Sequence, residues 1–468
     1  MKKETEYSRR KFLKASVAGV SALAASSLLS CGEKTTEQQD NQATTHAEKQ
    51  LGEMTYRTTT FTKDKVSLLG FGCMRFPTVG GVSAREDDSP IDQDAVNEMI
   101  DYAMAHGVNY YDTSPAYCKG RSEEAIGKAL ARHPRDKFFI ATKLSNFSED
   151  TWSREESLKM YYNSFKKLQV DYIDFMLLHG IGMGGMEAYN IRYVANGILD
   201  FLLEERKAGR IRNLGFSYHG DVEVFDYLLS MHDEIKWDFV QIQMNYVDWN
   251  HAKEINERNT NAEYLYAELE KRDIPVVVME PLLGGRLTSL PSHLSEMLKR
   301  QRPDDSIASW AFRYLGSFPK VLTSLSGMTY LEHVKDNVLT HSPIEPLSDS
   351  EMHLLYDVAK LMVEYPLVSC TGCQYCMPCP YGLDIPTIFR YYNKSVTEDC
   401  IVDNVQDPDY KKMRKAFLVG YDRAVPGLRQ ANHCIGCGEC MKHCPQGIEI
   451  PKEMRRIDEY VEKLKQQI

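Results

Sequence analysis

The sequence lacks a glycine-rich dinucleotide motif, a net positive charge and a long apolar run. No G-x-G-x-x-G follows the first expected strand, which argues against a doubly wound dinucleotide-binding sheet. The formal net charge of −10 argues against nucleic acid as a partner, because phosphate binding needs a basic face. The apolar stretch at 15–29 is too short and too rich in small residues for a transmembrane helix. What remains is a globular chain of 468 residues, long enough for two domains.

Short apolar runs alternate with amphipathic segments between residues 66 and 341. Strands that alternate with helices are typical of parallel βαβ units, and eight such units predict an α/β chain with a closed (β/α)8 TIM barrel. An open, doubly wound sheet is the alternative. The expected strands are 66–74, 109–114, 138–144, 172–179, 211–217, 239–245, 275–280 and 320–326, and the expected helices are 91–106, 122–132, 154–168, 191–207, 222–231, 262–271, 306–315 and 330–339.

Polar side chains stand at successive strand ends of this expected barrel, where catalysis in such folds takes place. The second strand ends near Asp112, with Tyr117 five residues later, the third ends near Lys143 and the fourth ends in His179. This set resembles the Asp, Tyr, Lys and His tetrad of the aldo-keto reductases, and the resemblance covers residues 60–340. It implies an oxidoreductase that interconverts a small-molecule carbonyl and alcohol by hydride transfer with NAD(P).

These side chains suit carbonyl reduction, which needs a hydride at carbon and a proton at oxygen. A free tyrosine has a pKa of about 10, and a nearby ammonium favours the phenolate. We therefore expect Lys143 to lower the pKa of Tyr117, and Asp112 to keep Lys143 charged and oriented. His179 is expected to donate a hydrogen bond to the carbonyl oxygen.

The resemblance also implies positions for the nicotinamide cofactor. Met279 stands where the family often stacks an aromatic ring, and His333 replaces the arginine that binds the 2′-phosphate of NADP. The resemblance therefore does not imply a strict NADP preference. The expected cofactor-binding residues are Ser217, Gln241, Met279, Gly327, His333 and Asn337.

Eight cysteines form two runs, at 370–380 and 434–445. The second run matches the C-x2-C-x2-C-x3-C-P pattern of a cubane iron–sulfur cluster, and the first is one residue shorter. Zinc and disulfides are the alternatives. The runs resemble a two-cluster ferredoxin domain, in which the cysteine before proline reaches the other cluster. The resemblance implies one 4Fe-4S cluster on Cys370, Cys373, Cys376 and Cys444, and another on Cys434, Cys437, Cys440 and Cys379.

The N-terminus resembles a twin-arginine export signal followed by a lipoprotein processing box. Residues 8–14 read S-R-R-K-F-L-K, and Leu-Leu-Ser precedes Cys31. The resemblance implies an exported protein on the periplasmic or cell-surface side, lipid-anchored to the membrane at Cys31. We expect a signal at 1–30, a polar tether at 31–53, the aldo-keto reductase barrel at 54–345 and a mainly α-helical ferredoxin-like domain at 346–468.

Four functions follow from these features. The first is an aldo-keto oxidoreductase whose clusters exchange electrons with a membrane redox partner. The second is a redox-neutral enzyme with tightly bound NAD and structural clusters. The third is a non-catalytic electron carrier, and the fourth is a surface-binding lipoprotein held by disulfides. A hydride carries two electrons and a cubane cluster passes one, so a flavin stays an open alternative as a converter.

Replacing Arg9 and Arg10 by lysine should keep the precursor in the cytoplasm, because the twin-arginine pair is the address that the export route reads. Cys31→Ala should release exported protein from the membrane. Cell fractionation with immunoblotting measures both effects. Lys11→Gln, at the variable position of the motif, is the control that should leave export unchanged. Exported, membrane-bound protein in both test variants contradicts the leader assignment.

Overall fold

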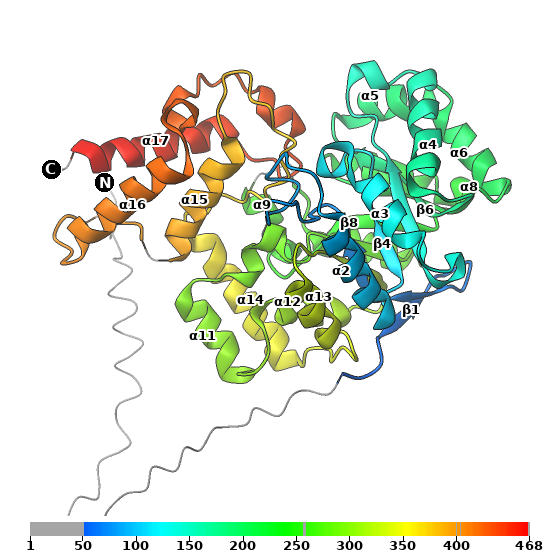
Figure 1. Ribbon diagram of the computed structural model, residues 1–468, viewed down its shortest axis with the longest axis horizontal. Coiled ribbons are helices and arrows are strands. Elements are labelled where there is room, and N and C mark those ends of the chain that lie inside the picture. The colour runs from blue at the N-terminus through cyan, green and yellow to red at the C-terminus, as the bar shows by residue number, and fades with distance from the viewer. Residues whose placement is uncertain (1–50, 256–258, 399, 403, 467–468) are drawn as a thin grey trace, which may run out of the picture. The chain divides into compact units, whose positions relative to one another are not determined.

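The computed structural model describes residues 51–255, 259–398, 400–402 and 404–466 (Figure 1). The expected signal, Cys31 and most of the tether therefore lie outside the described residues. Among the helices that the structure does describe, none is both long enough and apolar enough to span a membrane.

Eight parallel strands form a closed barrel in the order β10-β3-β4-β5-β6-β7-β8-β9. Each expected strand overlaps one strand of this barrel, so the (β/α)8 prediction is confirmed and the open-sheet alternative is wrong. Valine-rich runs such as β9 suit strands that are buried on both faces. The strands are β3 (Leu69–Gly72), β4 (Tyr110–Asp112), β5 (Phe139–Leu144), β6 (Ile173–Ile181), β7 (Ile211–Tyr218), β8 (Phe239–Gln243), β9 (Val276–Met279) and β10 (Val321–Gly327).

The first expected strand, at 66–74, is in fact two strands. Its start forms β2 (Lys65–Ser67), which pairs antiparallel with β1 (Tyr56–Thr58). Only β3 enters the barrel, where it pairs with β4 and β10. Val66 packs with residues of the barrel interior, including Phe175 and Phe239. Apolar residues continue across the break between β2 and β3, so the sequence pattern alone runs the two strands together.

Helices follow the strands and begin at side chains that cap them. Ser153 accepts from the backbone N–H of Glu156 at the start of α4, and Ser348 and Glu351 form a capping box on α14. The helices are α2 (Gln93–Ala105), α3 (Ser122–Leu130), α4 (Arg154–Leu168), α5 (Gly185–Tyr189), α6 (Ile198–Lys207), α7 (Val222–Ser230), α8 (His232–Ile235), α9 (Asp248–Ile255), α10 (Ala262–Lys271), α11 (Ser292–Gln301), α12 (Ile307–Gly316), α13 (Leu331–Thr340), α14 (Asp349–Glu364), α15 (Ile385–Thr397), α16 (Tyr410–Ala424) and α17 (Ile450–Gln466).

The helix expected at 191–207 is interrupted at Gly197. This glycine has a φ of 67°, in the left-handed region, and it separates a π-helical turn at Asn190–Val194 from α6. The backbone N–H of Ile198 donates to Asn196 Oδ1 at 3.1 Å, which starts α6 anew. The apolar pattern of the sequence is continuous here and therefore does not reveal the break in the helix at Gly197.

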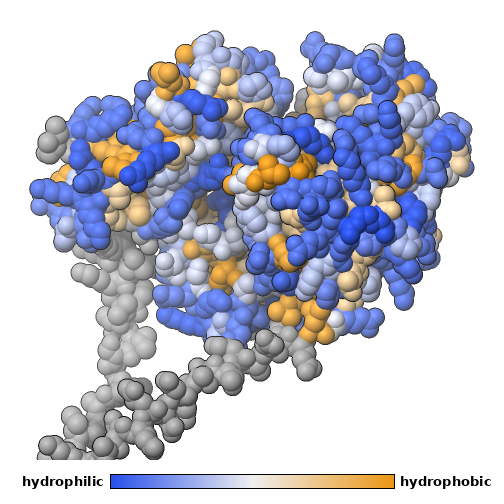
Figure 2. Space-filling model, viewed as in Figure 1, coloured by the Kyte–Doolittle hydropathy of each residue, from blue (hydrophilic) through white to orange (hydrophobic). Residues whose placement is uncertain are grey.

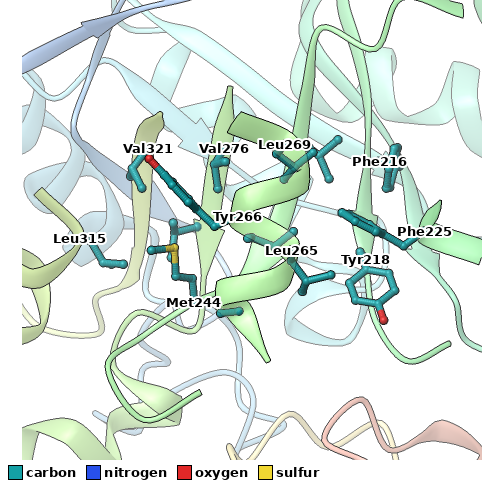
Figure 3. Packing of buried hydrophobic residues seen from close by; sticks show 14 of the residues in the cluster. Phe216, Tyr218, Phe225, Met244, Leu265, Tyr266, Leu269, Val276, Leu315 and Val321 are labelled. Atoms are coloured by element: carbon teal, nitrogen blue, oxygen red, sulfur yellow. The ribbon is translucent and has the colours of Figure 1, made fainter. Parts of the chain in front are cut away.

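The main core lies between the barrel strands and the surrounding helices. Figure 3 shows part of it, with Leu265 and Leu269 of α10 close to Val276 of β9 and Phe216 of β7 in the same cluster. The residues Leu355, Val358 and Met362 of α14 belong to this cluster too. Because α14 packs with the barrel, we propose that the second domain begins after Glu364 rather than at 346.

The C-terminal region is helical and has a core of its own. Ile388 and Phe389 of α15 pack with Phe417 of α16 and with Met454 and Ile457 of α17. These helices are drawn together in Figure 1. In the view of Figure 2, hydrophobic side chains appear at the surface only in small separate areas, as expected when most apolar residues lie in cores.

The first cysteine run lies against the barrel. Arg75 Nη2 donates to the Thr371 carbonyl at 2.9 Å. Gln243 and Gln446 exchange hydrogen bonds of 3.0 and 2.8 Å through their side-chain amides. Gly284 allows the closest approach, since a Cβ built there would lie 2.4 Å from Thr371 Cα. The two regions are therefore in direct contact beside the carboxyl ends of the barrel strands.

Replacing Gly284 by alanine should destabilise the protein more than replacing Gly285. Both glycines have positive φ, at 67° and 96°, so both variants carry a backbone cost of about 1–2 kcal/mol. Only a Cβ at Gly284 meets Thr371, because nothing lies within 4 Å of one at Gly285. Overpacking should add about 1–3 kcal/mol in Gly284→Ala. Thermal unfolding of anaerobic protein measures the difference, and equal midpoints would contradict tight docking of the cysteine run.

Candidate functional site

Barrel closure brings the four expected catalytic residues together. Asp112 ends β4, Lys143 lies in β5, His179 lies in β6, and Tyr117 lies on the turn after β4. Gly72 pairs with Asp112, and Asp112 pairs with Ala141, so neighbouring strands end at one edge. The four side chains are all buried, and Tyr117 is the most exposed at 8%.

Lys143 and Asp112 form a buried ion pair. Lys143 Nζ donates to Asp112 Oδ1 at 2.6 Å and to the Thr113 carbonyl at 2.9 Å. Burial lowers the pKa of Lys143 and raises that of Asp112, and the attraction between the two groups opposes both shifts. The same ammonium lies 4.7 Å from the centre of the Tyr117 ring. The expected contact between Lys143 and Tyr117 is therefore present.

The expected lowering of the Tyr117 pKa is wrong for this structure. Burial raises the pKa of Tyr117 well above its ordinary value, and the charge of Asp112 and the nearby Tyr375 raise it too. Desolvation of the phenolate outweighs the attraction of the cations around it. Tyr117 is thus held as the neutral phenol, the form that can donate a proton.

His179 is held as a neutral imidazole. Its Nδ1 lies 2.6 Å from Ser145 Oγ, which leaves Nε2 as the other hydrogen-bonding nitrogen. Burial lowers the pKa of His179 well below its usual range, and the charge of Lys143 lowers it further. The rings of His179 and Tyr117 are 6.0 Å apart. Ser145 follows β5 directly, a strand-end position that the sequence analysis overlooked.

A cavity of about 490 Å³ joins most of the expected cofactor residues to the catalytic ones. Asp112 and Tyr117 line one part of it. Ser217 is not among the lining residues, and its Oγ accepts from the Gly180 backbone N–H at 3.0 Å. The expected cofactor residues that do line the cavity are Gln241, Met279, Gly327, His333 and Asn337.

The far part of the cavity is bounded by β10 and the start of α13. Asn337 Nδ2 donates to Ser326 Oγ at 2.9 Å, and the Thr329 N–H donates to His333 Nδ1 at 3.4 Å. Burial lowers the pKa of His333, so the imidazole is neutral near pH 7. Ser306 Oγ also donates to Asp336 Oδ2 at 2.8 Å on this side, a contact that the sequence analysis did not anticipate.

Arg75, Arg85 and Glu280 also line the cavity and were missed by the sequence analysis. Glu280 directly follows β9, so its strand-end position was a usable signal. Its Oε2 accepts from the Gly284 N–H at 2.6 Å. Arg75 and Arg85 lie in the chain after β3, beyond the strand end, and carry no such signal.

The eight cysteines gather in the two groups that the resemblance implies. A small hollow of about 20 Å³ is lined by Cys379, Cys434, Cys437 and Cys440. Burial, together with the neighbouring thiols of Cys373 and Cys370, raises the pKa of the Cys444 thiol to about 12. The cysteine before each proline therefore lies with the other run.

This donor set fits two four-iron clusters. Thiolates are the usual cluster ligands, and the Gly372 N–H donates to Cys370 Sγ at 3.3 Å, as backbone amides do to ligand sulfurs. Among the described residues, no three His, Cys, Asp or Glu side chains converge as ligands of a single metal ion. In a cubane, each thiolate binds a different iron. The four cysteine sulfurs therefore surround a four-iron cluster and do not converge on a single ion.

Comparison with known proteins identifies the two regions. A model of the Aldo/keto reductase family matches residues 68–360, and a model of the 4Fe-4S dicluster domain matches residues 369–449. The first match covers more than half of the 468 residues. The chain therefore belongs to the aldo/keto reductase family of oxidoreductases, and it carries a C-terminal 4Fe-4S dicluster domain.

Individual proteins with low sequence identity to this chain are also similar to its barrel region. The L-galactose dehydrogenase of Arabidopsis thaliana is 24% identical over 299 residues, which cover 60% of this chain and 86% of that protein. The NADH-specific methylglyoxal reductase of Escherichia coli is 24% identical over 335 residues, covering 64% and 96%. Aldo-keto reductase AKR11C1 from Bacillus halodurans, in its holo form, superimposes with a TM-score of 0.51 at 24% identity, covering 65% and 96%. This structural likeness shows the barrel fold.

Anaerobically purified protein should contain about eight irons and eight sulfides, as two four-iron clusters. Cys376→Ser should lose the iron of one cluster and Cys440→Ser that of the other, because each removes a ligand from a different group. Cys400→Ser is the control, since Cys400 belongs to neither run. Iron, zinc and acid-labile sulfide analysis measures the outcome. Zinc in place of iron, or disulfides among the eight cysteines, would contradict the assignment.

Proposed function

We propose that this protein interconverts a carbonyl and an alcohol with a nicotinamide cofactor, and that its clusters carry electrons to or from the site. The observation that carries the proposal is the buried set of Asp112, Lys143, Tyr117 and His179 beside one large cavity. The cavity residues would hold the dinucleotide, with Gln241 and Met279 toward the nicotinamide and Gly327, His333 and Asn337 toward the adenosine. When bound, the cofactor supplies or accepts a hydride at the reacting carbon.

Tyr117 would move the proton. In reduction, the carbonyl π electrons go to oxygen as the hydride adds to carbon, and Tyr117 donates its phenolic proton to that oxygen and regains one from solvent. In oxidation, the tyrosine takes the proton of the alcohol as the hydride leaves. The raised pKa keeps Tyr117 protonated at neutral pH, so the resting form is the acid for reduction.

The other three residues would position the reacting groups and stabilise the charge that develops on them. Lys143, fixed by Asp112, places a cation 4.7 Å from the Tyr117 ring and so stabilises the phenolate that forms after proton transfer. His179, held through Nδ1 by Ser145, is left with Nε2 to hydrogen-bond the carbonyl oxygen. Because these groups are buried, their electrostatic effect on the reacting oxygen is stronger than it would be in water.

The contact between the first cysteine run and this site supports the proposed electron exchange. Tyr375, within the first cysteine run, has its ring 5.9 Å from Phe147, and the Phe147 ring lies 4.7 Å from His179. This proximity supports electron exchange between the clusters and the barrel, one electron at a time. A flavin remains the candidate converter between two-electron and one-electron steps.

We further propose that the protein acts outside the cytoplasm, anchored by a lipid at Cys31, with a membrane redox partner. The leader motifs support this location. A dinucleotide used there would travel tightly bound to the barrel. A neutral imidazole binds a 2′-phosphate less well than a guanidinium does. The neutral His333 therefore supports the use of NAD as well as, or instead of, NADP.

Tyr117→Phe should lower the reduction rate of a neutral aldehyde, such as 4-nitrobenzaldehyde, by roughly 10²–10⁴-fold, the worth of a general acid. Tyr110→Phe is the matched control. Tyr110 is also a buried tyrosine of the β4 region, but its hydroxyl has no partner among the described residues. Steady-state rates with NADH and NADPH measure the effect, and unchanged turnover in Tyr117→Phe would reject the role.

The pH profile provides a second readout. Because burial raises the pKa of Tyr117, the phenol persists as pH rises, and the rate of reduction should stay level from about pH 6 to pH 9. A decline that is centred near pH 7 and disappears in Tyr117→Phe would show that the tyrosine titrates there instead.

A further inference from the structure

The first cysteine run contacts barrel residues that line the cavity beside Tyr117. Arg75 Nη2 donates to the Thr371 carbonyl at 2.9 Å, and the absence of a side chain at Gly284 allows Thr371 to approach closely. The first cysteine run therefore packs against these two residues. The Tyr375 ring of that run lies 5.9 Å from Phe147, whose ring lies 4.7 Å from His179. The substrate would therefore meet side chains beyond the catalytic four.

Arg85 is the unexplained charge at this end of the cavity. It is 5% exposed and lines the same cavity as Tyr117. Its Nε and Nη2 have no hydrogen-bond partner among the residues that the structure describes. A buried guanidinium without an acceptor is costly, because it has lost the hydrogen bonds that water would supply. The unmatched donors indicate a site for an anion.

The neighbouring charged groups are already engaged. Asp112 accepts from Lys143 at 2.6 Å, and Glu280 accepts from the Gly284 N–H at 2.6 Å. Arg75 donates to the Thr371 carbonyl. Arg85 also lies near Glu280 and near the thiols of Cys370 and Cys373, yet its Nε and Nη2 still have no acceptor among the described residues.

We propose that Arg85 binds a carboxylate of the substrate, so that the enzyme acts on carbonyl compounds and alcohols that also carry a carboxylate. This inference rests on the proposed function. A guanidinium can bind both oxygens of a carboxylate through parallel N–H donors. With the carboxylate at Arg85, the substrate lies in the cavity that Tyr117 also lines, and its carbonyl can reach the phenol.

The test compares acids with their uncharged amides. Pyruvate and 4-formylbenzoate, with short and long spacings between carboxylate and carbonyl, are each assayed against the primary amide. The wild-type protein should prefer at least one acid by about 10²-fold in kcat/KM, the range expected for a buried charge pair. Arg85→Gln should remove that preference by raising KM for the acid, and it should lower kcat/KM for the acid by much more than for the amide. Arg85→Lys should restore part of it.

Arg300→Gln is the control, because its side chain is 78% exposed on α11. Titration calorimetry with oxalate tests the anion site without turnover, and Arg85→Gln should weaken oxalate binding by about tenfold or more. If no probe is reduced by the wild-type protein, including 4-nitrobenzaldehyde, the proposed function fails. Loss of oxalate binding in Arg85→Gln would then still support the anion site.

Three outcomes would overturn the inference while the proposed function stands. The first is reduction of 4-nitrobenzaldehyde without any preference for acid over amide. The second is a loss of iron from Arg85→Gln with the acid preference unchanged. That result would show that Arg85 stabilises the cluster at Cys373 and does not bind substrate. The third is weaker NAD binding with the acid preference unchanged, which would assign Arg85 to the phosphates of the dinucleotide.

Discussion

Closure of the parallel barrel by the pairing of β10 with β3 is the constraint on which the rest of the structure depends. Gly70 pairs with Leu325 in this register, and a Cβ on Gly70 would lie 2.7 Å from Leu325 Cδ2. A larger residue there would force the side chains of Leu325 and Thr323 to move. Closure aligns the carboxyl ends of all the strands, and residues far apart in the chain then share one buried site.

Burial of that site determines its chemistry. Lys143 and Asp112 are buried and form an ion pair, and Tyr117 and His179 are held in their neutral forms. Each shift has desolvation as its largest cause, so the environment outweighs the charge of any single neighbour. In the proposed function, the neutral Tyr117 would be the proton donor and the neutral His179 would hydrogen-bond the carbonyl oxygen.

Contact with the dicluster domain gives the barrel a feature beyond the usual catalytic set. The first cysteine run lies against Gly284 and Arg75, and it brings Tyr375 near Phe147. One segment therefore supplies expected cluster ligands and also contacts Arg75 and Gly284, two residues that line the cavity beside Tyr117.

The amino-acid sequence by itself determined the barrel, the four polar residues at its strand ends and the two cysteine runs, because each rests on local pattern and spacing. Strand–helix alternation, polar residues at strand ends and cysteines two or three residues apart can all be read from neighbouring positions. Tertiary structure alone decided the placement of α14 on the barrel, the position of Ser217 away from the cavity, the raised pKa of Tyr117 and the unpaired donors of Arg85. These properties depend on which distant side chains exclude water from a group, and packing between segments far apart in the chain sets that exclusion.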